Sequence, residues 1–444
     1  MRRREFLALP AVAYASGASV VPSARQLAWH KLETYAFLHF TLNTFTNKEW
    51  GYGDEDPRIF TPNEFDADAI VGTLKAAGMK AVILTCKHHD GFCLWPTKTT
   101  EHNIRAATGF RGGNGDVVRE VSEAARKQGL GLGVYLSPWD RNHKAYATPE
   151  YIEVYRQQLR ELLTGYGPVF EVWHDGANGG DGFYGGSREK RKIDPRTYYD
   201  WPGTWELVRK WQPNAVIFSD VGPDLRWVGN EKGFANETSW ATYEPHAPDG
   251  SGKPGPGFVL DKEGGTGHRD GSKWMPAECD VSIRPGWFWH EDQNAKVKTP
   301  EQLVDLYFKS VGRGGSFLLN VPPDRRGLLH ENDIASLQGY GKILRETFAT
   351  NHAAGKLKNG VVNVKSEFNV VRIREDIRLG QRVDAFSIDA WMDGAWKQLA
   401  EGTSIGACRL IRLAERVKTA KVRVRVVKSS ATPQISELGL YTIT

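Results

Sequence analysis

Two acidic residues, Asp175 and Glu231, have the surroundings that catalytic carboxyl groups need. Asp175 ends an apolar run that closes in a tryptophan and a histidine, and a glycine-rich loop follows it. Glu231 follows an apolar Trp-Val-Gly segment on a separate stretch, where burial would raise its pKa. Hydrolysis of a glycosidic bond needs two carboxyl groups, one that attacks or activates water and one that donates a proton. We take Asp175 as the candidate nucleophile and Glu231 as the candidate acid, with Glu237 in reserve.

Each acid also has a plain structural interpretation. A lone aspartate before a glycine often caps a helix or bonds a turn amide. A loop glutamate followed by a lysine, as Glu231 is by Lys232, is often a solvated surface pair. A catalytic role is favoured over these interpretations only because other polar and aromatic residues are expected close to both acids.

Adjacent histidines are the second notable feature, at His88 and His89. Imidazoles can bind a metal, fill a core as neutral rings, or hydrogen bond to sugar hydroxyls. Neighbours on an extended strand point to opposite sides, and the H-x-H pattern that would put two on one face is absent. The sequence therefore predicts neither a metal nor another cofactor. A metal-dependent barrel hydrolase built on this pair stays open as the alternative.

Short apolar runs alternate with longer amphipathic runs from residue 35 onward, which is typical of strands and helices that wind a parallel sheet. At least seven strands are predicted, enough to favour a (β/α)8-type barrel, whose strands carry the site at their carboxyl ends. The predicted strands lie at 35–40, 81–86, 130–136, around Val169, and at 215–219, 277–283 and 316–321. The predicted helices lie at 66–77, 117–128, 149–163, 204–211, 300–311 and 332–350.

The texture changes near residue 351. Four segments there alternate apolar and polar residues without a helical stretch, at 368–375, 382–391, 407–413 and 420–427, and residues 435–441 would close the module as a last strand. We predict an α/β fold: a catalytic barrel over residues 25–350, followed by a C-terminal all-β jelly-roll sandwich over 351–444.

The amino terminus resembles an export signal. A basic start, with Arg3 and Arg4 before Phe6, precedes an alanine-rich stretch, and the pattern is similar to twin-arginine signals. We expect residues 1–24 to be removed and the protein to be bacterial and periplasmic or secreted. No later segment is long and apolar enough for a membrane span, so we expect no membrane insertion.

Composition and cysteine usage exclude several classes. The chain of 444 residues is 40% hydrophobic and 25% charged, with a net charge of +5 and no long block of like charge, so nucleic acid is not the expected partner. The four cysteines lack CxxC spacing, and we expect them to be free and buried, with a Cys86–Cys93 bridge as the less favoured possibility.

Taken together, several segments resemble the α-L-fucosidases of glycoside hydrolase family 29. The resemblance runs through the barrel and the sandwich, and it implies a retaining exo-enzyme that acts on fucosylated oligosaccharides or glycoconjugates. The segments that carry it are 37–40, 49–50, 87–92, 133–135, 173–176 and 226–231.

The resemblance also implies roles for individual residues. It implies that Asp175 is the nucleophile and that three histidines hydrogen bond to the hydroxyl groups of fucose. The implied pocket residues are His39, His88 and His89, together with Glu49, Trp50, Tyr135 and Trp173.

Two further segments, 227–231 and 282–287, are similar to the branch of that family that prefers α-1,3 and α-1,4 fucose on branched glycans. In that branch the acid/base lies on the first of these loops, which favours Glu231. Trp287 is expected to stack near the pocket, and Arg284 is a weaker candidate. A glycosidase for a related sugar such as galactose, or a binding protein with a lapsed barrel, remains an alternative, and the oligomeric state is open.

Overall fold

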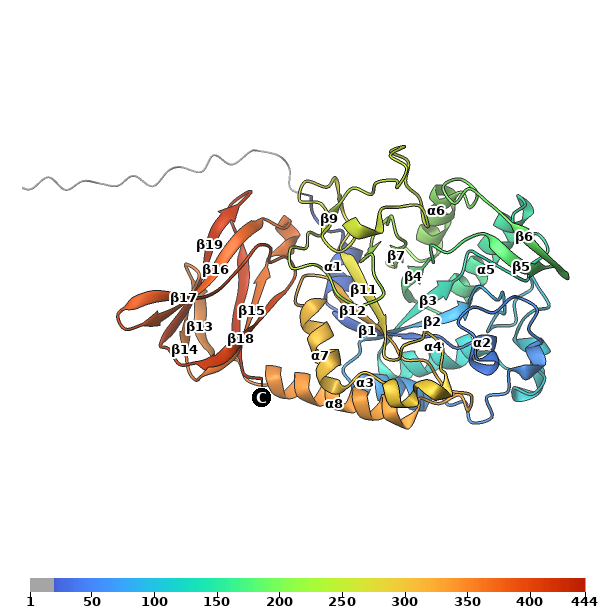
Figure 1. Ribbon diagram of the computed structural model, residues 1–444, viewed down its shortest axis with the longest axis horizontal. Coiled ribbons are helices and arrows are strands. Elements are labelled where there is room, and N and C mark those ends of the chain that lie inside the picture. The colour runs from blue at the N-terminus through green and yellow to red at the C-terminus, as the bar shows by residue number, and fades with distance from the viewer. Residues whose placement is uncertain (1–19, 444) are drawn as a thin grey trace, which may run out of the picture.

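The computed structural model describes residues 20–443, and its centre is an eight-stranded, all-parallel sheet (Figure 1). Its strands are hydrogen bonded in the order β7-β4-β3-β2-β1-β12-β11-β8. The bounds are β1 (Thr34–Leu38), β2 (Ala81–Lys87), β3 (Gly131–Leu136), β4 (Val169–Trp173), β7 (Val216–Phe218), β8 (Arg226–Trp227), β11 (Ala277–Ser282) and β12 (Ser316–Asn320).

A single parallel bridge between Phe218 and Leu225 connects the two ends of this order, so the sheet is a nearly closed barrel. Most strand residues are buried, as expected where both faces of a parallel sheet are covered. The expected (β/α)8-type barrel is confirmed. The carboxyl ends of its strands therefore meet at one rim.

Six of the longer helices belong to the strand-and-helix units of the barrel. Sequence explains their ends: Asp66 and Asp116 cap the first turns of α3 and α4, and Gly129 ends α4 with a left-handed φ of 76°. The bounds are α3 (Ala67–Ala76), α4 (Val117–Gln128), α5 (Glu150–Gly165), α6 (Trp201–Trp211), α7 (Pro300–Lys309) and α8 (Glu331–Phe348). The short α2 (Leu42–Thr46) follows β1.

The alternation breaks between β8 and β11. The chain there runs through a long, mostly irregular segment that holds the short pair β9 (Thr242–Tyr243) and β10 (Lys273–Trp274) and one turn of 3-10 helix. A hairpin of β5 (Gly180–Tyr184) and β6 (Ser187–Arg191) extends the loop after β4. Both insertions follow the carboxyl ends of strands, which is where they can shape a site.

The residues after α8 form two antiparallel sheets that pack face to face, as expected (Figure 1). One sheet contains β13 (Ala353–Lys358), β14 (Val361–Val364), β19 (Lys421–Ser429), β16 (Val383–Met392) and β17 (Ala395–Gly402). The other contains β18 (Arg409–Val417), β15 (Phe368–Glu375) and β20 (Ile435–Tyr441).

Polar contacts fix this sandwich to the barrel. Arg374 pairs with Glu33 at 2.5 Å, and Arg269 pairs with Asp384 at 2.5 Å. Leu410 donates its backbone N–H to the carbonyl of Gly312 at 3.0 Å. These contacts join the two parts through side chains and backbone alike.

The first described helix, α1 (Ala24–His30), belongs to the folded protein. Ser23 caps it, and the buried Gln26 donates to the carbonyls of Asp224 and Trp274 at 2.8 and 2.6 Å. Most of the expected signal, residues 1–19, lies outside the described residues. Among the helices in 20–443, none has the length and apolar character that a membrane crossing requires.

Candidate active site

Asp175 and Glu231 line the same cavity, although 55 residues of chain lie between them. The cavity has a volume of about 260 Å³ and opens at the carboxyl ends of the barrel strands. Trp173 and Phe218 form part of its apolar wall, and their rings stack 4.2 Å apart. A cavity with two carboxyl groups and flat aromatic walls suits a sugar ring.

Asp175 is held on both oxygens. Its Oδ2 accepts a hydrogen bond from the Tyr135 hydroxyl at 3.0 Å, and its Oδ1 accepts one from the Ala177 amide at 2.6 Å. The Nε2 atom of His89 lies 3.9 Å from Oδ2. The carboxylate is therefore oriented at the rim while part of its surface stays open to the cavity.

Glu231 lies on the loop after β8, so its carboxyl group approaches the cavity from another side. Its pKa is raised above the ordinary carboxyl value, first by burial and also by the negative charges of Asp175 and Glu49, while a hydrogen bond from Trp287 opposes the shift. A raised pKa keeps a larger fraction of the group protonated, which a proton donor requires.

The three histidines that directly follow β1 and β2 lie together, and His89 is the one nearest Asp175. The rings of His88 and His89 are 4.1 Å apart, and those of His39 and His88 are 5.7 Å apart. Burial lowers the pKa of His39 to about 3 and that of His89 to about 4, and it lowers the pKa of His88 as well. All three rings are therefore neutral near pH 7.

Hydrogen bonds fix the tautomers of two of these rings. Asn320 donates its amide to Ser282 and to the Trp287 carbonyl, so its Oδ1 accepts the Nδ1–H of His39 at 2.9 Å. Ser137 donates to the Trp139 carbonyl and so accepts from Nδ1 of His89 at 2.6 Å. Each ring keeps an unprotonated Nε2, which can accept a hydrogen bond from a hydroxyl group.

Of the aromatic residues expected at the pocket, Trp173 lines the cavity, and the others lie against the histidines or against Trp173. The ring of Trp287 lies 5.1 Å from that of His39, and the ring of Trp50, which is 53% exposed, lies 5.1 Å from that of His89. Tyr135 stacks on Trp173 at 5.2 Å.

Glu49 supports the loop that carries Trp287. Its Oε2 accepts the Trp287 amide at 2.7 Å, and its Oε1 lies 2.5 Å from Nε2 of His290. The backbone at Gly286 can come this close to the carboxylate only because glycine has no Cβ. A Cβ at this position would lie 2.3 Å from Oε1 of Glu49 and clash with it. Glu49 thus fixes a neighbouring loop, a role that the sequence alone did not indicate.

Three more acids line the cavity: Asp220, Asp261 and Asp280. Burial and the charge of Asp175 raise the pKa of Asp220 to about 7, although a hydrogen bond from the Gly257 amide at 2.7 Å opposes the shift. Burial also raises the pKa of Asp280, which accepts the Trp227 Nε1–H at 2.8 Å. The sequence signal that could have identified Asp280 is its position on the strand β11. Acids at alternate positions of that strand, Glu278 and Asp280, face the barrel interior.

Two residues weighed from the sequence lie elsewhere. Glu237, the reserve acid, has a side chain 79% exposed and 3.4 Å from Arg313, and it does not line the cavity. Arg284 is buried and pairs with Asp333 at 2.9 Å, so it supports the fold beneath the Trp287 loop. All four cysteines are free and buried, and the Cys86–Cys93 bridge is not formed.

Comparison with known proteins supplies the family. A family model described as alpha-L-fucosidase matches residues 14–347. Alpha-L-fucosidase 1 of Arabidopsis thaliana is 41% identical, over 95% of this chain and 87% of the relative. A glycoside hydrolase 29 family member from an unknown rumen bacterium has a TM-score of 0.89 and 44% identity, over 96% of this chain and 78% of that one. A Ruminococcus gnavus GH29 fucosidase in complex with fucose has a TM-score of 0.82 and 31% identity, over 98% and 97%.

The relatives correct the expected localisation. The Arabidopsis protein and a second plant relative, from Oryza sativa subsp. japonica with 38% identity, each match over 95% of this chain. A bacterial origin with export to the periplasm was therefore wrong as an inference from the sequence. The basic, alanine-rich start that suggested it falls almost wholly outside the described residues.

Proposed function

The chain belongs to the α-L-fucosidase family of glycoside hydrolases, and from this membership and the site geometry we propose that it is a retaining exo-enzyme. Its substrates are terminal α-1,3- and α-1,4-linked fucose residues on oligosaccharides or glycoconjugates. One observation carries the mechanism: Asp175, oriented on both oxygens, and Glu231, with its raised pKa, line the same cavity.

The first step forms a bond between Asp175 and the sugar. A carboxylate oxygen of Asp175 attacks the anomeric carbon while the bond from that carbon to the leaving oxygen breaks. Glu231 gives its proton to the leaving oxygen, which departs as an alcohol. The hydrogen bonds from Tyr135 and from the Ala177 amide hold the attacking group in place.

The second step restores the enzyme. Glu231, now ionised, takes a proton from water, and the water oxygen attacks the anomeric carbon as its bond to Asp175 breaks. Two inversions leave the product with the α-configuration of the substrate. Every proton and electron pair is accounted for by these two side chains and water.

The histidine cluster binds the sugar. His39 and His89 each present an unprotonated Nε2 to accept from a hydroxyl group, while Trp50 and Trp287 supply flat faces for the apolar side of the ring. Neutral rings keep this pocket free of extra positive charge beside Asp175.

The linkage preference rests on the sequence of two loops and on the shape of the cavity. Residues 227–231 and 282–287 are similar to the branch of the family that acts on branched glycans. Phe258 and Asp261 also line the cavity, and we assign to them the contacts with the sugar that carries fucose.

Two assays test the proposal. Lewis-type trisaccharides, an α-1,2-fucosyl disaccharide, an aryl α-fucoside and an aryl α-galactoside should be compared at equal concentration. We expect fucose release to be fastest from the branched trisaccharides, and equal release from the α-1,2 disaccharide would contradict the linkage preference. Proton NMR of the first product should show the α-anomer, whereas a β-anomer would rule out the two-step route.

A further inference from the structure

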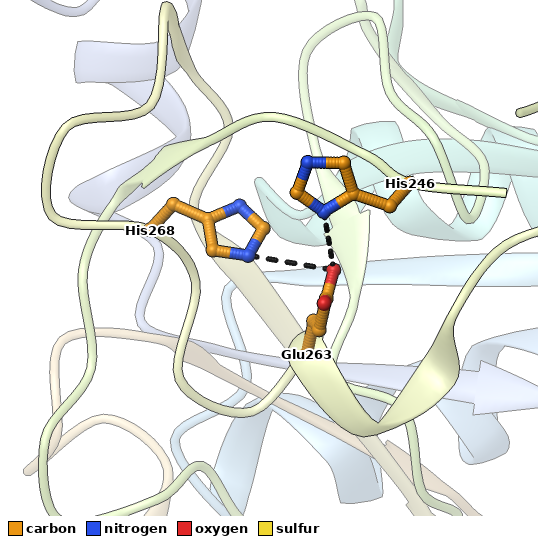
Figure 2. A group of neighbouring side chains, drawn as sticks. All are labelled: His246, Glu263 and His268. Carbon is orange, nitrogen blue, oxygen red and sulfur yellow. Dashed lines mark hydrogen bonds and ion pairs between the residues drawn. The ribbon is translucent and has the colours of Figure 1, made fainter. Parts of the chain in front are cut away.

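A second cluster of chemically active side chains lies outside the catalytic cavity. His246, Glu263 and His268 point toward one another, as Figure 2 shows. Oε2 of Glu263 lies 2.9 Å from Nδ1 of His246 and 3.4 Å from Nε2 of His268. The three potential ligand atoms all lie within 4.8 Å of one another, and none belongs to the lining of the cavity that holds Asp175.

We propose that these three side chains bind a divalent transition-metal cation of the Zn²⁺ type. Two imidazole nitrogens and one carboxylate oxygen form a donor set that suits such borderline cations, and three protein ligands leave a coordination position for water. Hard cations such as Ca²⁺ prefer sites made of oxygen atoms and are excluded by this set.

The surrounding structure arranges the ligands in advance. The ring of His268 stacks on that of Tyr243 at 5.0 Å with an interplanar angle of 10°, and the two imidazole rings are 5.0 Å apart. Glu263 projects from a single turn of 3-10 helix, Asp261–Glu263. Little rearrangement is therefore needed to bring the three donors to one ion.

Hydrogen bonds of both histidines must change when the ion binds. Nδ1 of His246 donates to Oε2 of Glu263 at 2.9 Å, so its proton must move to Nε2 before Nδ1 can bind the ion. Nδ1 of His268 accepts the Glu244 amide N–H at 3.2 Å, so the neutral ring holds its proton on Nε2 and donates toward Glu263. Metal binding needs the lone pair on Nε2, so the proton moves to Nδ1 and the exposed Glu244 amide turns to water. A metal-ligating histidine usually donates its second N–H to an acceptor, and the lack of one here weakens the affinity by about tenfold or more.

The ion would connect two ends of a loop that walls the catalytic cavity. His246 and Glu263 flank a segment that contributes Pro248, Phe258 and Asp261 to that wall. The Leu260 amide already donates to the His246 carbonyl at 2.9 Å, so the two ends are close without an ion. A bound cation would add a second connection between them and stabilise the folded loop.

Calorimetric titration of Zn²⁺ into the full-length chain, treated with chelator and dialysed, tests the proposal. We expect saturable binding at one site per chain and a rise in unfolding temperature that depends on Zn²⁺ concentration. His246→Ala and Glu263→Gln should each lose this binding. His246 has a side chain 52% exposed, so its removal should leave the fold intact, which circular dichroism checks.

His352→Ala is the matched control, because it removes a histidine in the sandwich and should bind Zn²⁺ as the wild type does. Absence of saturable binding would overturn the proposal. Binding of equal strength in the wild type and in folded His246→Ala would also overturn it, because the ion would then be held by other histidines. Unaltered fucoside hydrolysis in His246→Ala without Zn²⁺ would agree with the separation of this site from the catalytic one.

Discussion

Tyr135 donates its hydroxyl group to Oδ2 of Asp175 across 3.0 Å, although 40 residues separate the two in sequence. The parallel register of β3 and β4 explains the contact, because it pairs Tyr135 with Trp173, two residues before Asp175. The barrel therefore brings an orienting group to the candidate nucleophile without help from any loop. Four predictions about the site and one about stability follow from contacts of this kind.

Replacing Asp175 by alanine should remove nearly all turnover of an aryl α-fucoside. We expect a loss of about a thousandfold or more in kcat, or about 4 kcal/mol of transition-state stabilisation, because no other group can form the covalent bond. Asp292→Ala is the control, since Asp292 is exposed and, among residues 20–443, its one ion pair is with Lys296. Activity of Asp175→Ala within tenfold of the wild type would contradict its role.

Replacing Tyr135 by phenylalanine removes one hydrogen bond to a carboxylate and keeps the aromatic ring. Such a bond contributes about 1.5–3 kcal/mol, so kcat/KM should fall by about 10- to 150-fold. The stacking on Trp173 persists in this variant, and the unfolding temperature should change little. An unchanged kcat/KM would show that the contact does not orient the nucleophile.

Replacing Glu231 by glutamine should separate activated substrates from natural ones. A glycan leaving group needs a proton, so its hydrolysis should fall by about 10²- to 10⁴-fold, whereas the first step with an aryl fucoside should be much less affected. Glu237→Gln, on the exposed residue that pairs with Arg313, should lose little with either substrate. Equal losses on glycan and aryl fucoside in Glu231→Gln would argue against the acid role.

The pH profile gives a second test of Glu231. A general acid works in its protonated form, so activity on glycans should decline as pH rises through the pKa of Glu231. Burial raises the pKa of Glu231 above the ordinary carboxyl value. The decline in activity should therefore occur at a higher pH than the pKa of an ordinary carboxyl group. Kcat/KM for a glycan, measured across pH, should show this decline in the wild type and lose it in the residual activity of Glu231→Gln.

Replacing Arg284 by methionine should reduce stability and leave the chemistry of the folded enzyme largely intact. Arg284 and Asp333 form a fully buried ion pair, and removal of one partner from such a pair costs about 3–5 kcal/mol. The double variant with Asp333→Asn should recover part of this loss. Urea unfolding measures both, and an unchanged midpoint in Arg284→Met would contradict the role given to the pair.

The barrel was predictable because its strands and helices differ in hydrophobic period. Seven of the eight strands appear in the sequence as apolar runs, but β8 has only two residues and no period to detect. Helix α6 begins at Trp201, three residues before the predicted start, because its proline fits the first turn of a helix. The hydrophobic pattern therefore predicts which helices and strands form, whereas the residues at which they begin and end depend on packing.

The site was partly predictable for a similar reason. Asp175 follows a strand end directly, so its place at the rim could be inferred. The role of Glu49 could not be inferred in this way. Both of its carboxylate oxygens contact the loop that bears Trp287, and that loop is far away in sequence. Phe258 and Asp261 come from an irregular segment whose path the sequence does not encode in any period.

Identification of the residue that bonds to the sugar tests the central claim most directly. A fucosyl fluoride with fluorine at carbon 2 should slow the second step and allow the intermediate to accumulate on the wild-type enzyme. Peptide mapping by mass spectrometry should then place one added fluorosugar on Asp175 and none on the Asp175→Ala variant. An adduct on another residue, or an inverted product formed with no adduct, would contradict the account.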